Sequence, residues 1–261
     1  MTSYFRRYTQ GEHEQVWNEV RGLGPVPGGL REDVEAVATA TMERVARHVT
    51  RLAEALPELG FVRAADGLPP HQPPTAGTAA VVRETEAAIG VLPAALKASF
   101  LTVGDVSFLG DCAAIGLYYH QGPLPESGPP GAAYPDPLDV AGAEHLRYEW
   151  EAYLDDPDDP DDPDDPDDPD GPDDLDDPDG EFLFSLAPDE YHKANISGGT
   201  HDVVLPDASA DPEIHGVIGR KGITLVEYLR TSISWGGFPG WEFAPGPAPE
   251  ALARLVVRPD F

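Results

Sequence analysis

Five side chains of the types used in acid–base catalysis stand beside predicted turns: Asp105, Asp111, Asp136, His192 and His201. A hydrolase could use such carboxylates and imidazoles as general acid and base if a single concave pocket held two or more of them. Aspartate is also a common turn residue, because its carboxylate accepts hydrogen bonds from nearby backbone N–H groups. The hydrolase therefore stays a third hypothesis, and we assign no catalytic residue.

The spacing of ligating side chains predicts neither a metal site nor a cofactor site. His13-Glu14 begins like the zinc-protease pattern His-Glu-x-x-His, but position 17 is Trp. Cys112 is the only cysteine, which excludes an intrachain disulfide and a thiolate zinc cluster. We interpret it as a small buried hydrophobic residue. The sequence contains no nucleophile elbow, phosphate-binding loop or dinucleotide fingerprint.

Three large aromatic residues, Trp235, Phe238 and Trp241, stand in a turn rich in glycine and proline. Exposed aromatic side chains of this kind often anchor protein interfaces. In a second interpretation the glycines end the preceding helix and the rings cover the edge of the core. We name these three residues, together with Asp136, as the candidates for binding a partner.

The charge of the chain is unevenly distributed. Its 261 residues contain 47 Asp and Glu against 17 Lys and Arg, which gives a formal net charge of −30. Residues 155–179 alone hold 16 Asp, 7 Pro, one Gly and one Leu, so the rest of the chain carries −14. This balance argues against sequence-independent binding to nucleic acid or an anionic membrane, because phosphate would be repelled. It is compatible with a basic protein partner.

The Asp-Pro repeat of residues 155–179 is predicted to be a disordered acidic insertion. Proline fixes φ and removes hydrogen-bond donors, while dense like charge opposes collapse. We interpret it as a loop between two packed elements. Two alternatives stay open, a decoy for a basic toxin and weak calcium binding. A stiff repeat spreads its carboxylates apart, whereas a calcium site needs ligands that converge on one centre.

Hydrophobic periodicity predicts an α+β domain. Helices are predicted for residues 11–22, 30–56, 78–90, 144–154 and 223–234. A further helix is predicted to open at Leu92-Pro93 and to end before Gly104. The predicted strands are residues 106–109, 113–119 and 181–186, and a pair at 191–196 and 201–205 with 197–199 as its turn. No apolar stretch approaches the ~18 residues of a membrane span, and the first residues lack a signal-peptide core. We therefore expect a soluble cytoplasmic protein.

Two stretches in a fixed order resemble the SUKH (Smi/Knr-like) superfamily, which is named after a fungal cell-wall regulator. Residues 84–104 carry a Glu-bearing helix, Ile-Gly-x-Leu-Pro and a second helix that ends in Phe and a Gly turn. Residues 225–240 carry a closing helix and Gly-Gly-Phe-Pro-Gly. Residues 134–138 and 185–199 are also similar to bacterial members, so the resemblance covers roughly 78–241.

The resemblance implies a central, mostly antiparallel sheet flanked by helices. It also implies that bacterial members often act as immunity proteins, which bind and block toxins used in contact-dependent competition. The superfamily carries no established catalytic residues, so none is assigned from it.

The expected organisation has three parts. Residues 1–66 form an N-terminal helical segment packed on the core, because the apolar stripe of residues 34–56 needs a partner. Residues 78–241 form the SUKH-like domain, which residues 155–179 interrupt, and residues 242–261 form a C-terminal tail.

These observations lead to the hypothesis of a non-enzymatic protein-binding module of the immunity or antitoxin type. An acidic, aromatic-bearing face would cover the basic surface of a toxin domain, and charge would speed the encounter. The alternative is an intracellular scaffold or regulatory protein in which the acidic repeat is a spacer. Neither hypothesis involves a cofactor, nucleic acid or a membrane.

Overall fold

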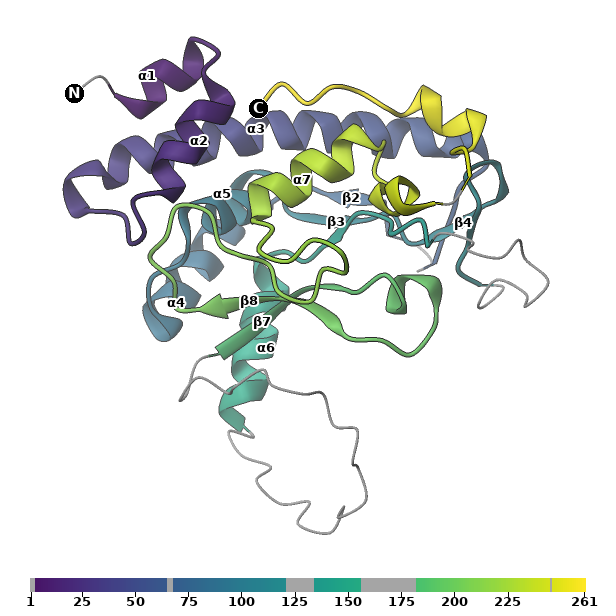
Figure 1. The fold of residues 1–261 in the computed structure, drawn as a ribbon. Helices are drawn as coiled ribbons and strands as arrows, with labels where there is room; N and C mark the ends of the chain where they lie inside the picture. The colour runs from purple at the N-terminus through teal and green to yellow at the C-terminus, as the bar shows by residue number, and fades with distance from the viewer. Residues whose placement is uncertain (1–2, 65–67, 121–133, 156–181, 245) are drawn as a thin grey trace.

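The computed structural model describes residues 3–64, 68–120, 134–155, 182–244 and 246–261. Most of the repeat therefore lies outside the described residues. The main helices are α1 (Tyr4–Thr9), α2 (His13–Arg21), α3 (Arg31–Ala55), α4 (Thr78–Ile89), α5 (Ala94–Thr102), α6 (Ala143–Asp155) and α7 (Leu225–Ser234) (Figure 1). The predicted helices are confirmed to within a few residues at each end. The short helix α1 was not predicted.

The strands form three small antiparallel sheets in the described part of the chain, which corrects the prediction of one central sheet. One sheet has the order β1-β4-β5, one the order β2-β3-β6, and β7 pairs with β8. Their bounds are β1 (Val62–Arg63), β2 (His71–Gln72), β3 (Asp105–Ser107), β4 (Gly110–Cys112), β5 (Leu117–Tyr118), β6 (Asp139–Val140), β7 (Phe182–Pro188) and β8 (Thr200–Leu205). Most of these strands span two or three residues, too few to support one continuous sheet.

Local turns explain why two predicted strands differ from the structure. In the segment 113–119, a 3₁₀ turn (Ala113–Ile115) precedes Gly116, whose φ of +70° belongs to the left-handed region. In the segment 191–196, a 3₁₀ turn, η4 (His192–Ala194), replaces the strand. β8 therefore pairs with β7, from Phe182 opposite Leu205 to Pro188 opposite Thr200.

Asp189 holds this second turn in place. Its carboxylate accepts hydrogen bonds from the backbone N–H groups of His192, at 2.8 Å, and Gly199, at 2.6 Å. Its carbonyl accepts a third from the N–H of Lys193, at 2.9 Å. A residue that looks like an ordinary loop aspartate thus closes residues 189–199 into a compact loop.

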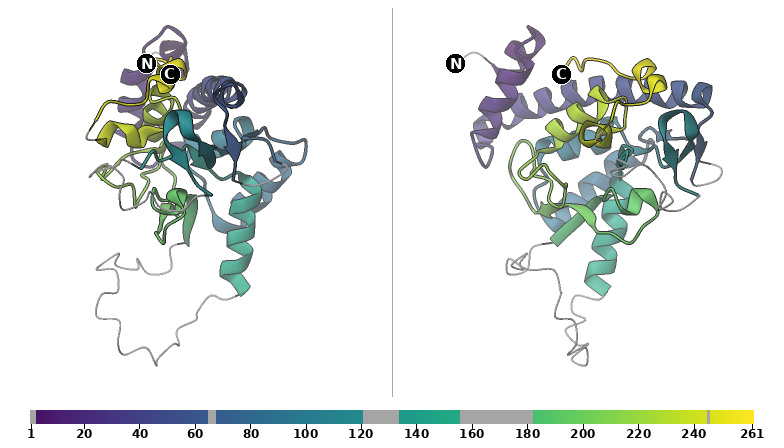
Figure 2. Two further views of the ribbon diagram at one scale, coloured as in Figure 1. Left: turned by 90° about the vertical axis from the view of Figure 1, so that its right-hand side faces the viewer. Right: turned by 45° about the vertical axis from the view of Figure 1, so that its right-hand side comes forward.

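The long helix α3 organises the N-terminal part of the fold. It packs against α1, α5 and α7, and lies along one side of the molecule (Figures 1 and 2). Its buried face shares one hydrophobic core with the later helices and strands. Trp17 of α2 is fully buried and donates from Nε1 to Thr41 Oγ1 of α3 at 3.0 Å. Residues 3–64 therefore pack on the remainder of the described chain.

The last residues also return to the core. Leu252, Leu255 and Phe261 are buried, and Arg230 of α7 donates from Nε to the Phe261 carbonyl at 2.9 Å. Among the described residues, no helix is both long enough and apolar enough to cross a membrane.

Candidate functional site

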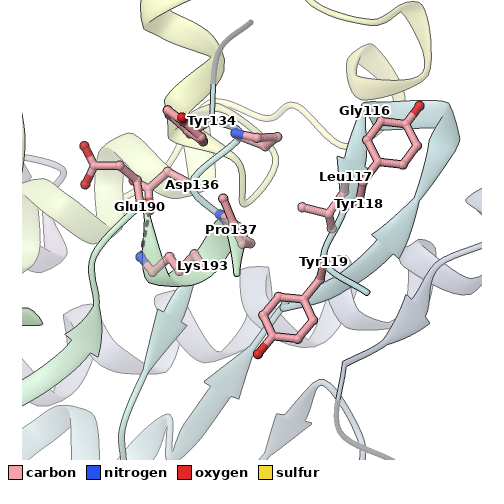
Figure 3. A pocket seen from close by; sticks show the side chains of 11 residues that line it. Gly116, Leu117, Tyr118, Tyr119, Tyr134, Asp136, Pro137, Glu190 and Lys193 are labelled. Carbon is pink, nitrogen blue, oxygen red and sulfur yellow. Dashed lines mark hydrogen bonds and ion pairs between the residues drawn. The ribbon is translucent and has the colours of Figure 1, made fainter. Parts of the chain in front are cut away.

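A buried lysine marks the centre of the site. Lys193 lies on η4, its side chain is 0% exposed, and its Nζ is 2.7 Å from Asp136 Oδ1 (Figure 3). The same ammonium donates to the Tyr228 hydroxyl of α7 at 3.1 Å. Three segments far apart in the sequence, those of Asp136, Lys193 and Tyr228, therefore meet at the Lys193 ammonium ion.

The charges around Lys193 decide its protonation. Burial by itself disfavours the ammonium ion. The nearby Asp136 carboxylate, with Tyr228 and Asp139, outweighs burial and holds the pKa of Lys193 above its ordinary 10.5. Burial raises the pKa of Tyr228 to about 12, although Lys193 opposes the shift. At neutral pH the site therefore contains a charged lysine, its carboxylate partner and a neutral phenol.

The turn after α7 positions Asp136. The Leu138 N–H donates to the Gly237 carbonyl at 2.7 Å, and the Gly240 N–H donates to the Pro135 carbonyl at 3.0 Å. A Cβ on Gly240 would lie 1.7 Å from the Tyr134 carbonyl oxygen, so only glycine permits this approach. Asp136 itself has a φ of +48°, an uncommon conformation for a non-glycine residue.

An open cavity of about 420 Å³ lies beside this network. Its walls combine three aromatic rings with aliphatic, glycine and charged residues: Tyr134, Asp136, Glu190, Tyr191, Val217, Ile218, Gly219, Arg220, Gly240 and Phe243. The rings of Tyr134 and Tyr191 meet edge to face, with centroids 5.2 Å apart. Tyr191, Ile218 and Phe243 are 37%, 49% and 58% exposed. Exposed apolar side chains thus line the cavity, and together with the half-buried Tyr134 they form what we call the aromatic rim: Tyr134, Tyr191, Ile218 and Phe243.

Of the charged residues that line this cavity, two have close partners of opposite charge. Asp136 pairs with Lys193, and Arg220 Nη2 lies 2.6 Å from Glu242 Oε2. For Glu190, the nearest basic group among the described residues is His201, with Nε2 3.7 Å from Glu190 Oε2.

His201 is 1% exposed, and neither of its ring nitrogens has a hydrogen-bond partner in the described part of the chain. Glu190 is therefore a cavity carboxylate whose one basic neighbour within 4 Å, among the residues described, is the buried imidazole of His201.

The three aromatic candidates, Trp235, Phe238 and Trp241, do not line this cavity. Phe238 is fully buried, with its ring centroid 6.3 Å from that of Phe108. Trp235 and Trp241 are partly buried against the core. A Cβ on Gly116 would lie 3.0 Å from Trp241 Cζ2, which shows how closely that ring is packed. Their segment supports the 134–138 loop. Of the four named candidates, Asp136 lines the cavity.

The five residues of the hydrolase hypothesis are distributed over different places. Each of the cavities described holds at most one of them. Asp136 lines the cavity of the aromatic rim, and Asp105 lines another. Asp111 pairs with His120, and the exposed His192 bonds through Nδ1 to the Gly199 carbonyl at 2.9 Å. His201 is buried beside Glu190.

A second cavity, of about 450 Å³, is more polar. Asp105, Asp139, His145 and Glu149 line it, and His145 Nε2 lies 3.0 Å from Glu149 Oε1. Burial raises the pKa of Asp139 to about 6, against the attraction of Lys193. The hydrogen bond and charge of Glu149 raise the pKa of His145. In the described residues, no group of three or more His, Cys, Asp or Glu side chains is arranged to hold a metal ion.

Sequence reasoning missed Glu190, Lys193 and the aromatic rim. Glu190 and Lys193 stand in a polar, turn-rich segment, where charged residues are ordinarily solvated. His145 and Glu149 are four residues apart, a spacing that places both side chains on one face of a helix, and this is a local signal that could have indicated the polar cavity.

Comparison of the chain with protein-family models, with curated proteins and with solved structures finds no match.

Proposed function

We propose that this chain is a non-enzymatic protein-binding module of the immunity or antitoxin type, which acts by covering a basic surface of a toxin. The observation that carries the proposal is the aromatic rim, where exposed apolar side chains surround a cavity containing Glu190. Exposed apolar patches rimmed by polar residues often mark interaction sites. Buried aromatic contacts supply much of the binding energy in such interfaces.

The charge of the chain supports a basic partner. Outside residues 155–179 the chain still carries −14, which would attract a basic surface over a longer range than the cavity itself. Attraction of this kind mainly speeds encounter, while the rim contributes specificity and a slow dissociation. The resemblance of residues 78–241 to SUKH proteins supports the immunity type.

The test is capture of a partner by the full chain from its native host. A variant with Tyr191, Ile218 and Phe243 each changed to Ser should lose a toxin-like partner, because the apolar contact is removed. The matched control changes Tyr148, Leu154 and Leu183 to Ser, which are 67%, 55% and 41% exposed, and should keep it. Capture of the same partner by both variants would contradict the proposed surface. An immunity protein should also protect cells against a toxin encoded by the neighbouring gene, and failure of this protection would contradict the immunity type.

The alternative, a scaffold in which the acidic repeat is a spacer, rests on the 16 aspartates of residues 155–179. Deleting these residues separates the two functions. Unchanged partner capture favours the rim and makes the repeat a loop. Lost capture, with the thermal unfolding transition of the deletion variant retained, makes the repeat the effector.

A further inference from the structure

Glu190 gives the cavity of the aromatic rim a specific chemical preference. Its side chain is 15% exposed and lines the cavity beside Tyr134 and Tyr191. A carboxylate removed from water is costly unless a cation or several hydrogen bonds compensate it. Lys193 is committed to Asp136 and Arg220 to Glu242, so neither is free to neutralise Glu190.

The walls of the cavity suit a flat cation. Aromatic faces attract cations through the ring quadrupole, and arginine is the side chain that most often exploits this. A guanidinium ion is planar and weakly hydrated, so it stacks on rings and pairs with a carboxylate at a lower desolvation cost than an ammonium ion.

The protein already contains one example of this chemistry at the cavity wall. The guanidinium carbon of Arg220 lies 4.9 Å from the centroid of the Phe243 ring, and its Nη2 bonds to Glu242.

We propose that this cavity receives an arginine side chain from the protein partner, with the guanidinium beside the rings of Tyr134, Tyr191 and Phe243 and paired with Glu190. The inference rests on the proposed function and names the group that the rim recognises. Charge complementarity selects this occupant, since Glu190 is a carboxylate in an aromatic site and its one basic neighbour within 4 Å in the described part of the chain is His201, at 3.7 Å. A cavity of about 420 Å³ falls within the range of roughly 300–1,000 Å³ typical of ligand sites, so it has room for one side chain.

The test is an NMR titration of the full-length protein with N-acetyl-arginine N-methylamide. The matched probe is N-acetyl-citrulline N-methylamide, which has nearly the same shape but no charge. We expect the arginine probe to shift amide signals of residues 190–193 and 217–220, and to bind at least about tenfold more tightly than the citrulline probe. Tenfold corresponds to about 1.4 kcal/mol. The lysine probe of the same form should bind more weakly than the arginine probe.

Two substitutions test the residues. Glu190→Gln should weaken arginine binding at least about tenfold, whereas Glu84→Gln on α4, where the side chain is 68% exposed, should leave it within twofold. Phe243→Leu keeps the site apolar but removes a ring, and should weaken binding severalfold. Phe243 is 58% exposed, so this change does not remove a core residue.

The inference is overturned if the arginine and citrulline probes bind equally, if the lysine probe binds more tightly than the arginine probe, or if Glu190→Gln leaves binding unchanged. Partner capture separates this failure from failure of the proposed function. A partner captured equally by the wild type and Glu190→Gln, but lost by the triple serine variant, supports the proposed function and contradicts the arginine site. Glu190-dependent binding of the arginine probe without capture of any partner supports the site and contradicts the function.

Discussion

Replacing Asp139 with Asn should stabilise the protein at neutral pH. Asp139 lies on β6 in the polar cavity, and within the described part of the chain its carboxylate accepts one long hydrogen bond, of 3.3 Å, from Ser107 Oγ. Burial raises its pKa from 3.8 to about 6, and the attraction of Lys193 and Arg63 does not offset this. Asn preserves the shape of the side chain and cannot ionise.

The size and sign of the effect follow from linkage between protonation and folding. The folded protein binds the Asp139 proton more tightly than the unfolded chain does, so ionisation costs stability as the pH rises. The cost is absent below about pH 4, grows between pH 4 and pH 6, and is complete above. A rise from 3.8 to about 6 corresponds to about 3 kcal/mol at 1.36 kcal/mol per pKa unit. Because Asp139 keeps some surface exposure, we expect about 2 kcal/mol.

The assay is urea unfolding of the full-length protein at one-unit intervals from pH 4 to pH 8. The Asp139→Asn variant should gain stability over the wild type progressively up to pH 7 and show little difference at pH 4. Glu84→Gln removes one negative charge from an exposed position and serves as the control for net charge. A stability difference that does not change with pH, or a ¹³C carboxyl titration of Asp139 with a midpoint near 4, would refute the reasoning.

Three other substitutions test the packing that supports the site. Asp136→Asn should lower the free energy of unfolding in urea by about 3–5 kcal/mol, because it leaves the buried Lys193 ammonium without its carboxylate. The double variant with Lys193→Met should lose clearly less than the sum of the two single changes, and additive losses would contradict a coupled pair. Asp211→Ala should lower the free energy of unfolding by about 3 kcal/mol in the same measurement, since its fully buried carboxylate pairs with Arg21 at 2.8 Å and accepts a hydrogen bond from the first turn of α7. A loss below about 1 kcal/mol would argue against this role. Gly240→Ala should lower the melting temperature by several degrees and weaken partner capture, because the added Cβ collides with the Tyr134 carbonyl, and an unchanged thermal transition would contradict that close approach.

The helices were predictable because their signals are local. The apolar repeat of residues 30–56 fixes the buried face of α3 wherever that helix packs. At α7, the side chain of Thr224 caps the first turn and Glu227 returns the hydrogen bond, a pattern readable from residues three apart. Glycines after α4 and α7 stop those helices for conformational reasons that need no tertiary contact.

Strand pairing was less predictable because it joins segments distant in the sequence. The glycines of residues 197–199 suggested a hairpin turn after a strand at 191–196, but Asp189 closes those residues into a turn and leaves β8 to pair with β7. Strands of two or three residues carry too little periodicity to fix a partner or a register.

The sequence by itself determined helices α2 to α7, the concentration of charge in residues 155–179 and the lack of recognised catalytic motifs. Only the tertiary structure decided which charged side chains are buried. Lys193 enters the core because Asp136, 57 residues earlier, neutralises it there. Among the described residues, Glu190 has no lysine or arginine within 4 Å, and its nearest basic group is His201 at 3.7 Å. The physical reason is that burial and charge compensation depend on which distant segments meet in space.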